Sequence, residues 1–457
     1  MGLRLIGAKA ASTLSAWGLK YVFRRPAANF PGKFALYLDP QVISHTAGKL
    51  SKGSVIVCGT NGKTTVNNLL ADTFEAAGHS VICNRTGANL DSGVATALLR
   101  STPADWGVFE SDELWLAKTL PQLRSDYVLL LNLFRDQLDR VGEINTIQDS
   151  IVAALESSPN TVLVFNADDP LCAAIAARVK NRQVAFGIDG SLGLSQNTVA
   201  DGQMCQLCSG MLEYEYRQYG QLGAYRCPTC GFERPRLGYR AQGVLLDAQG
   251  FSCTVLEAAT EHVGGAAAED IKEAATIHAP YSGAYMVYNL LAALVTARLA
   301  GCPADAFQQA LNAFNPQNGR LQRFVVRERQ AMLNLAKNPT GFNQNLKLIA
   351  QGEDPKAVAL FINDKEADGH DISWLWDVDF EELAQLTDTR VFAGGIRKHD
   401  LQLRLKYAGI DAQRIEGVAD VLEHIADIPS AHLYLIANYT ALPSVRSEMA
   451  QLATKEV

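Results

Sequence analysis

Residues 55–65 constrain the fold more strongly than any other part of this sequence. They read Val-Ile-Val-Cys-Gly-Thr-Asn-Gly-Lys-Thr-Thr, so a β-branched run ends in a glycine-containing turn. Apolar residues then recur at helical spacing over 66–77, and Gly78 follows as a helix stop. These features predict a buried strand, a phosphate-binding loop and the N-terminus of a helix. Backbone N–H groups, the helix dipole and Lys63 attract an anion in such a loop, and a threonine hydroxyl can hold Mg²⁺.

Short apolar runs follow this loop and alternate with helical stretches, which predicts a parallel sheet covered by helices on both faces. Ligands of such sheets bind beyond the carboxyl ends of the strands, so the residues directly after each run carry the most information. Glu110 follows one run, and we expect it to hold the same Mg²⁺ as Thr64. Asp169 and Pro170 are expected to cap and start a helix. The expected strands cover residues 81–83, 106–109, 127–131, 161–165 and 183–186.

The length and composition limit the class of protein. A chain of 457 residues with 48% hydrophobic content is expected to form two or three globular domains. The net charge of −7 argues against a non-specific nucleic-acid binder, which would usually be basic. No apolar run approaches the roughly 20 residues that a membrane-spanning helix needs. Residues 5–23 predict an amphipathic helix that packs on the body of the protein, with contact to an anionic membrane surface as the alternative.

Four of the nine cysteines form two Cys-x-x-Cys pairs, Cys205 with Cys208 and Cys227 with Cys230. Each pair turns so that two thiolates converge, and two such turns together form a tetrahedral Zn²⁺ site. The expected reducing compartment argues against disulfides, and the doubling of the motif argues against a redox pair. We therefore expect a zinc ribbon at about 201–240, inserted as a structural or partner-docking element.

A second α/β pattern begins near Gly319. Apolar runs at 357–362, 390–393 and 433–437 are the expected strands of this unit. The polar segment 363–377 directly follows the first of these runs, where a ligand loop is expected.

Taken in order, these motifs resemble those of the Mur ligases, and the short phosphate loop also resembles that of the folylpolyglutamate synthetases. The resemblance implies that ATP binds to Gly59, Thr60, Asn61, Gly62, Lys63, Thr64 and Thr65. It also implies that Asn289 contacts the adenine or ribose and that Arg320 contacts the phosphates. The further matches are Glu110, the segment with Asn132, Asp136 and Asp139, Asn-Ala-Asp-Asp-Pro at 166–170, the helix at 283–293, Gly319-Arg320 and Asn-Leu-Ala-Lys-Asn-Pro at 334–339.

The sequence departs from the Mur ligase pattern in three places. Gln137 replaces the family's histidine, and no lysine occurs from 141 to 178, where many Mur ligases carry a carbamylated lysine. Use of a second Mg²⁺ therefore stays open. The family's nucleotide-sugar domain has no counterpart before the phosphate loop, so we do not expect this chain to bind a UDP-sugar peptide.

The motif Asp-Gly-x-Asp-x-Ser-Trp-x-Trp-Asp at 368–377, with the zinc ribbon and Asn-Tyr-Thr at 438–440, resembles the MurT family. These proteins are the synthetase subunits of lipid II isoglutaminyl synthases. The resemblance implies ATP-dependent amidation of the D-glutamate α-carboxylate in the lipid II stem peptide, through an acyl phosphate, for peptidoglycan synthesis. It also implies a cytoplasmic heterodimer with a GatD-like glutaminase subunit, whose Cys–His dyad is completed by an aspartate of the synthetase. Asp368 and Asp371 are the candidates, and Gly369 favours Asp368 because it would free the loop to reach the partner.

The expected architecture is therefore α/β, with three parts. An N-terminal helical segment (1–50) precedes a Mur ligase central P-loop domain (51–317) that carries the zinc ribbon, and a Rossmann-like C-terminal domain follows (318–457). Lys63 and Arg320 would neutralise the transferring phosphoryl group. The first alternative is a ligase that adds an amino acid, against which the 368–377 motif argues. The second is a zinc-ribbon NTPase that binds nucleic acid, against which the acidic charge argues.

Overall fold

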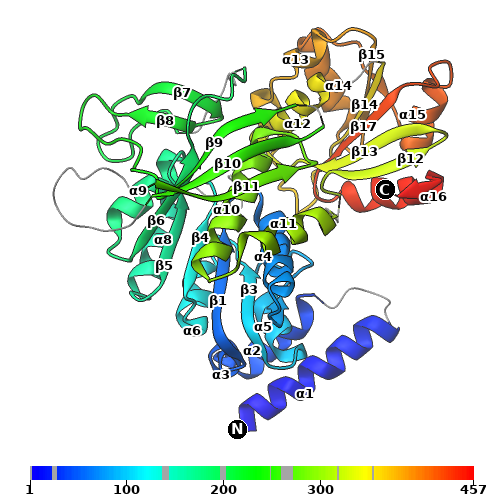
Figure 1. The fold of residues 1–457 in the computed structure, drawn as a ribbon. Helices are drawn as coiled ribbons and strands as arrows, with labels where there is room; N and C mark the ends of the chain where they lie inside the picture. The colour runs from blue at the N-terminus through cyan, green and yellow to red at the C-terminus, as the bar shows by residue number, and fades with distance from the viewer. Residues whose placement is uncertain are drawn as a thin grey trace.

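A computed structural model describes residues 3–22, 28–135, 144–195, 202–247, 249–258, 271–315, 319–352 and 355–456. Its described strands form a nine-stranded sheet, a seven-stranded sheet and a two-stranded hairpin (Figure 1). No helix within the described ranges is long and apolar enough to cross a membrane. Residues 136–143, which include Asp136, Gln137 and Asp139 of the Mur ligase pattern, lie outside the described residues.

The nine-stranded sheet has the order β11-β10-β9-β6-β5-β4-β1-β3-β2. Strand β1 (Leu50–Cys58) lies between two parallel neighbours. The other five strands of the parallel part are β2 (Val81–Cys83), β3 (Ala104–Glu110), β4 (Tyr127–Leu130), β5 (Val162–Asn166) and β6 (Gln183–Ile188). The five strands expected after the phosphate loop are thereby confirmed.

The predicted parallel pairing is confirmed for β1–β6, but the complete sheet is mixed. Strand β9 (Tyr239–Leu246) pairs with β6 in parallel, and β10 (Phe251–Ala258) and β11 (Ile271–Ala279) continue the sheet in antiparallel order. Many of their residues are only partly buried or are exposed, and these strands lack the continuous apolar runs by which the other strands were found.

The two faces of the nine-stranded sheet are each covered by helices. Val55 and Val57 of β1 face one hydrophobic core, and Ile56 and Cys58 face another, as the two-residue period of a strand requires. The first core includes α4 (Lys63–Ala76), α10 (Ala284–Leu299) and α11 (Ala304–Ala313). The second includes α5 (Asp91–Arg100), α6 (Leu116–Leu123), α8 (Ile144–Glu156) and α9 (Pro170–Arg178). Helix α9 begins at Pro170, and Asp169 caps it through a hydrogen bond from Leu171 N, as expected.

The N-terminal part is helical and lies on the nine-stranded unit. It consists of α1 (Leu3–Trp17), the π-helical turn η1 (Gly18–Val22), α2 (Phe30–Leu38) and α3 (Val42–Ala47). Helix α1 packs against α2, and α2 packs against α5. Gly32 of α2 lies so close to Ser92 that a Cβ atom there would fall 1.8 Å from the Ser92 carbonyl oxygen. The predicted helix over 5–23 thus ends earlier, at Trp17, and continues as a π-helical turn.

The seven-stranded sheet has the order β16-β15-β14-β17-β13-β12-β18. Strands β14 (Lys356–Phe361), β15 (Thr389–Gly394) and β17 (His432–Ala437) confirm the three expected strands. The other strands are β12 (Gln322–Val326), β13 (Arg329–Leu335), β16 (Gln413–Arg414) and β18 (Lys455–Glu456). The helices are α12 (Pro339–Gln351), the 3-10 turn η2 (Ser373–Asp377), α13 (Glu381–Ala384), α14 (Lys398–Tyr407), α15 (Val418–His424) and α16 (Leu442–Leu452).

Candidate nucleotide and metal sites

The phosphate loop connects β1 to α4, and its two glycines permit close packing from both sides. Both have positive φ angles, 131° at Gly59 and 92° at Gly62. A Cβ atom on Gly59 would lie 2.9 Å from the Asn132 carbonyl oxygen, and one on Gly62 would lie 2.3 Å from Asn289 Oδ1. Other residues would therefore be strained by the backbone and obstructed by neighbours at these positions. The loop leads into the first turn of α4, whose backbone N–H groups suit an anion.

Lys63 is buried at the first position of α4. Its ammonium donates to the carbonyl oxygens of Gly59 and Thr60 and lies 3.4 Å from Glu113 Oε1. Burial lowers the pKa of Lys63, but the carboxylates of Glu113 and Asp112 outweigh it, and the net shift is upward. The side chain therefore stays charged at neutral pH. Glu113 was not anticipated from the sequence, because its only signal is its place three residues after Glu110.

Two asparagines beyond the carboxyl ends of strands bind the backbone of the phosphate loop and of Glu110. Asn132 follows β4; its Oδ1 accepts a hydrogen bond from Asn61 N at 2.9 Å, and its Nδ2 donates to Asn61 O at 3.0 Å. Asn84 follows β2 and forms the same kind of pair with the backbone of Glu110, with both distances 2.9 Å. Asn84 was missed in the sequence, although the rule of inspecting residues directly after each strand would have found it.

Glu110 and Thr64 are placed as a divalent-cation site. A Cβ atom on Gly87 would lie 3.4 Å from Thr64 Oγ1 and 3.6 Å from Glu110 Oε1, so both oxygens face the same small space. Glu110 is buried, and its Oε2 has no hydrogen-bond partner. Burial raises the pKa of Glu110, whereas Thr64 and Arg320 lower it. A hard oxygen set with an unpartnered carboxylate oxygen fits Mg²⁺.

A cavity of about 590 Å³ surrounds this site and is bounded by both sheet units. The predicted residues Asn289, from α10, and Arg320, ahead of β12, both line it. Gly59 forms the loop but not the cavity wall. The seven-stranded unit contributes Asn334, Lys337, Thr340 and Gln344 to the wall, together with Glu366, Ala367 and Tyr439. The loop after β14 therefore meets the phosphate loop at one cavity.

Asp368 and Asp371 lie in that loop but in different environments. Asp368 is only 5% exposed, and its carboxylate accepts hydrogen bonds from Thr440 N at 2.9 Å, from Thr440 Oγ1 and from Lys365 N. Asp371 is exposed and accepts from Ser373 N at 2.8 Å and Ser373 Oγ at 2.9 Å. A partner could reach Asp371 directly, whereas Asp368 would first have to leave Thr440.

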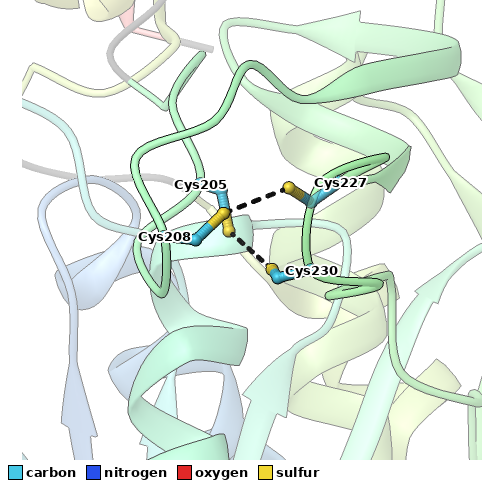
Figure 2. A group of neighbouring side chains, drawn as sticks. All are labelled: Cys205, Cys208, Cys227 and Cys230. Carbon is cyan, nitrogen blue, oxygen red and sulfur yellow. Dashed lines mark hydrogen bonds between the residues drawn. The ribbon is translucent and has the colours of Figure 1, made fainter.

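The four cysteines of the two Cys-x-x-Cys pairs converge, and their sulfur atoms all lie within 4.8 Å of one another (Figure 2). The Sγ–Sγ distances are 3.6 Å between Cys205 and Cys230 and 3.5 Å between Cys208 and Cys227. Sulfur atoms about 3.8 Å apart are expected around a tetrahedral Zn²⁺ with Zn–S bonds of about 2.3 Å. The donor set and its size therefore fit Zn²⁺.

The two halves of the cluster have the same backbone geometry. Ser209 N donates to Cys205 O at 2.8 Å, and Gly231 N donates to Cys227 O at 2.9 Å. Both Ser209 and Gly231 have positive φ angles. The hairpin of β7 (Glu213–Tyr219) and β8 (Leu222–Arg226) lies between these two turns in sequence. Outside the cluster Cys58, Cys172, Cys253 and Cys302 are buried, and Cys83 is partly exposed.

Two known protein families match this chain, one within the nine-stranded unit and its cysteine insertion and one within the seven-stranded unit. Residues 57–225 match the Mur ligase middle domain, and residues 335–442 match the MurT ligase C-terminal domain.

Named relatives match nearly the full length. The chain is 31% identical over 443 residues to the lipid II isoglutaminyl synthase (glutamine-hydrolyzing) subunit MurT of Streptococcus pneumoniae, with 94% of each chain covered. It is 32% identical over 426 residues to the subunit of the same name from Staphylococcus aureus, with 92% of each covered.

Solved structures with a similar fold are more distant in sequence. A pseudomurein peptide ligase type C from Methanothermus fervidus has a TM-score of 0.68 at 19% identity, covering 98% of this chain and 97% of its own. MurF from Acinetobacter baumannii has a TM-score of 0.64 at 16% identity, covering 92% of this chain and 80% of its own. At these identities the likeness concerns the fold alone, which is the Mur ligase α/β fold.

Proposed function

This chain belongs to the MurT family of lipid II isoglutaminyl synthase subunits, and from that premise we propose how its residues carry out the reaction. The chain is an ATP-dependent ligase of peptidoglycan synthesis that amidates lipid II. In detail, we propose that it converts the α-carboxylate of the stem-peptide D-glutamate to the amide, which gives D-isoglutamine.

The observation that carries this proposal is the shared cavity. The phosphate loop lies on one side of it, and Glu366, Ala367 and Tyr439 line the other. A carboxylate activated at the phosphate loop would then lie near the loop that carries Asp368 and Asp371. Ammonia released by a partner docked at that loop would have a short path to the activated carboxylate.

The proposed reaction has two steps, phosphoryl transfer and then acyl transfer to ammonia. A carboxylate oxygen of D-glutamate attacks the γ-phosphorus of ATP, the bond to ADP breaks, and an acyl phosphate forms. Ammonia then attacks the acyl carbon, phosphate leaves, and a proton is lost to solvent. Lys63 and Arg320 would stabilise the charge of the transferring phosphoryl group, because this chemistry depends mainly on positioning and charge. Thr64 and Glu110 would hold Mg²⁺, which neutralises phosphate charge when it is bound.

The loop and helix α10 supply the binding contacts. Thr60, Asn61, Gly62 and Thr65 would bind the phosphates, and Asn289 would contact the adenine or ribose. Asn289 lies against Gly62, so its amide is held at the mouth of the phosphate loop.

Ammonia must come from a second chain. Glutamine hydrolysis needs a nucleophilic cysteine with a histidine base. Cys58, Cys172, Cys253 and Cys302 are buried, four others form the cluster, and burial raises the pKa of Cys83 to about 12. We propose that a GatD-like glutaminase forms a heterodimer with this chain, and that Asp368 or Asp371 orients its catalytic histidine.

The cysteine cluster is proposed to bind Zn²⁺ and to act as a structural element. Its two turns close a loop of the chain around the β7–β8 hairpin, which contacts the nine-stranded unit through Tyr225 and Ala167. The metal would hold this insertion in one conformation. We also propose the domain boundaries near residues 50 and 318, and a cytoplasmic location in which these thiols stay reduced.

The experiment is to co-express the chain with a candidate glutaminase and incubate the complex with ATP, amide-¹⁵N glutamine and lipid II. With unlabelled glutamine, mass spectrometry of the released stem peptide should show a loss of about one mass unit. With amide-¹⁵N glutamine, the product should contain ¹⁵N. ADP release that depends on a free amino acid instead would overturn the proposal, because it would indicate an amino-acid-adding ligase.

A further inference from the structure

Apart from Leu5, which is buried, helix α1 buries small residues and exposes large apolar ones. Its packed face carries Ala8, Ala11, Ser12 and Ala16, which are all at most 9% exposed. The opposite face carries Ile6, Leu14, Trp17 and, in η1, Tyr21, which are 51–70% exposed. The spacing of these residues places them along one side of the helix. The rings of Trp17 and Tyr21 contact each other, with centroids 6.1 Å apart.

Helix α2 likewise buries small residues and exposes large apolar ones. Pro31, Gly32 and Ala35 are buried against its neighbours. Phe30, Phe34, Tyr37 and Leu38 are 38–83% exposed and recur at helical spacing. Together α1, η1 and α2 carry eight of the eighteen exposed large apolar side chains in the part of the chain that the structure describes. We call these eight residues the N-terminal apolar face.

The segment of sequence that carries this face has charged residues of one sign only. Residues 1–38 contain six basic residues and no acidic residue, although the whole chain has a net charge of −7. Arg4 and Lys33 are exposed on α1 and α2 themselves. Exposed aromatic and aliphatic side chains flanked by basic residues are typical of helices that lie in a membrane interface.

We propose that the N-terminal apolar face binds the surface of an anionic phospholipid bilayer, with its large side chains in the headgroup region and its basic residues beside the lipid phosphates. A soluble partner protein or a second copy of this chain would explain the apolar side chains but not the complete absence of acidic residues. The proposal deepens the proposed function, since a lipid-linked substrate is then met at the membrane where it resides. Its test, however, needs no substrate.

The test is co-sedimentation of the full chain, alone and with its glutaminase, with phosphatidylglycerol–phosphatidylcholine vesicles or with pure phosphatidylcholine vesicles. The wild-type chain should bind the anionic vesicles, and binding should weaken as salt is raised. Leu14→Ser combined with Trp17→Ser should lower the bound fraction about tenfold or more, because two interfacial anchors are lost. Arg4→Glu combined with Lys33→Glu should reduce the preference for anionic lipid, because the charge of the segment falls by four.

Matched controls keep the result specific. Leu245→Ser removes a leucine that is equally exposed, 73% against 70% for Leu14, from strand β9. Lys180→Glu combined with Arg182→Glu gives the same change in net charge at exposed positions elsewhere. Both controls should bind vesicles like wild type, and all variants should keep the wild-type thermal transition.

Three results would overturn the proposal: no binding of wild type to anionic vesicles, equal loss in the controls, or a dimer in light scattering that the α1 variants dissociate without any vesicle binding. Amidation of a water-soluble stem-peptide substrate with ammonium salts is measured in parallel. If the wild-type complex lacked that activity, the proposed function would be contradicted. Vesicle binding, and hence this inference, would be unaffected.

Discussion

Asn338 Nδ2 donates a hydrogen bond to Asn61 Oδ1 at 3.3 Å, and this contact joins the seven-stranded unit to the phosphate loop of the nine-stranded unit. Asn338 also caps α12, where its side chain accepts from Gly341 N at 2.8 Å. Asn61 is in turn held by Asn132 at the end of β4. A chain of three amides therefore fixes the two halves of the cavity relative to each other at the point where phosphate is expected to bind.

Lys63→Ala should lower amidation about a hundredfold or more with either glutamine or ammonium salts, because the charge that stabilises the phosphoryl group is lost. The readout is amide formation in the stem peptide under both nitrogen sources. Lys272→Ala, which removes an exposed lysine, is the matched control and should keep full activity. Ammonium-driven turnover in the Lys63 variant would show that this loop does not bind the transferring phosphate.

Glu110→Gln should raise the Mg²⁺ concentration needed for half-maximal activity about tenfold or more, because a carboxylate ligand becomes a neutral amide. The measurement is a Mg²⁺ titration at saturating ATP. Glu366→Gln removes the same charge from the wall of the same cavity and should leave the titration unchanged. An unaltered titration in the Glu110 variant would mean that the metal is held elsewhere.

Asp368→Asn and Asp371→Asn should separate the two nitrogen sources. One of these two carboxylates is expected to orient the catalytic histidine of the glutaminase. The variant that lacks it should lose glutamine-dependent amidation and keep ammonium-driven amidation, while the other variant keeps both. Asp368 also anchors Thr440, so its ammonium-driven rate reports whether the loop is still folded. If both variants keep glutamine-dependent activity, the orienting acid lies outside this loop.

Cys208→Ser and Cys230→Ser should each reduce bound zinc from about one ion per chain to near zero and lower the melting temperature, since a structural zinc site contributes to folding. Elemental analysis and thermal unfolding of the purified chain measure the two effects. Cys83→Ser changes a cysteine outside the cluster and should keep the metal. A full zinc content in either cluster variant would contradict the four-cysteine assignment.

Deprotonation of Asp169 should lower the free energy of unfolding as pH rises from 4 to 7. Burial raises the pKa of Asp169 from 3.8 to about 6, although Leu133 N and Leu171 N donate to it. Between these two values the folded state binds more protons than the unfolded state, so the free energy of unfolding falls with pH. The shift corresponds to roughly 3 kcal/mol at neutral pH.

The measurement is urea unfolding of wild type and Asp169→Asn across this pH range. The difference between the two should move in favour of wild type as pH falls from 7 to 4, because the asparagine cannot titrate. A difference that stays constant with pH would mean that Asp169 has an ordinary pKa in the folded protein.

Much of the site could be predicted because its signals are local. The strand, the two glycines and Lys63 are contiguous, and a Cys-x-x-Cys turn brings its two sulfurs together through the backbone between them. Strands β9–β11 were not predicted, because their apolar residues are interrupted by polar ones and many of their positions are partly or fully exposed. Figure 1 shows where they extend the sheet beyond β6.

Short-range spacing was enough to predict the strand–loop–helix of residues 55–77, the four-cysteine cluster and three of the seven strands of the second unit, β14, β15 and β17. The folded chain was needed to find that Asn84 holds Glu110, that Glu113 pairs with Lys63 and that Thr440 covers Asp368. The last contact joins residues that lie 72 positions apart in the sequence. No periodicity encodes such a contact, because it arises only when the carboxyl ends of separate strands are brought to one edge.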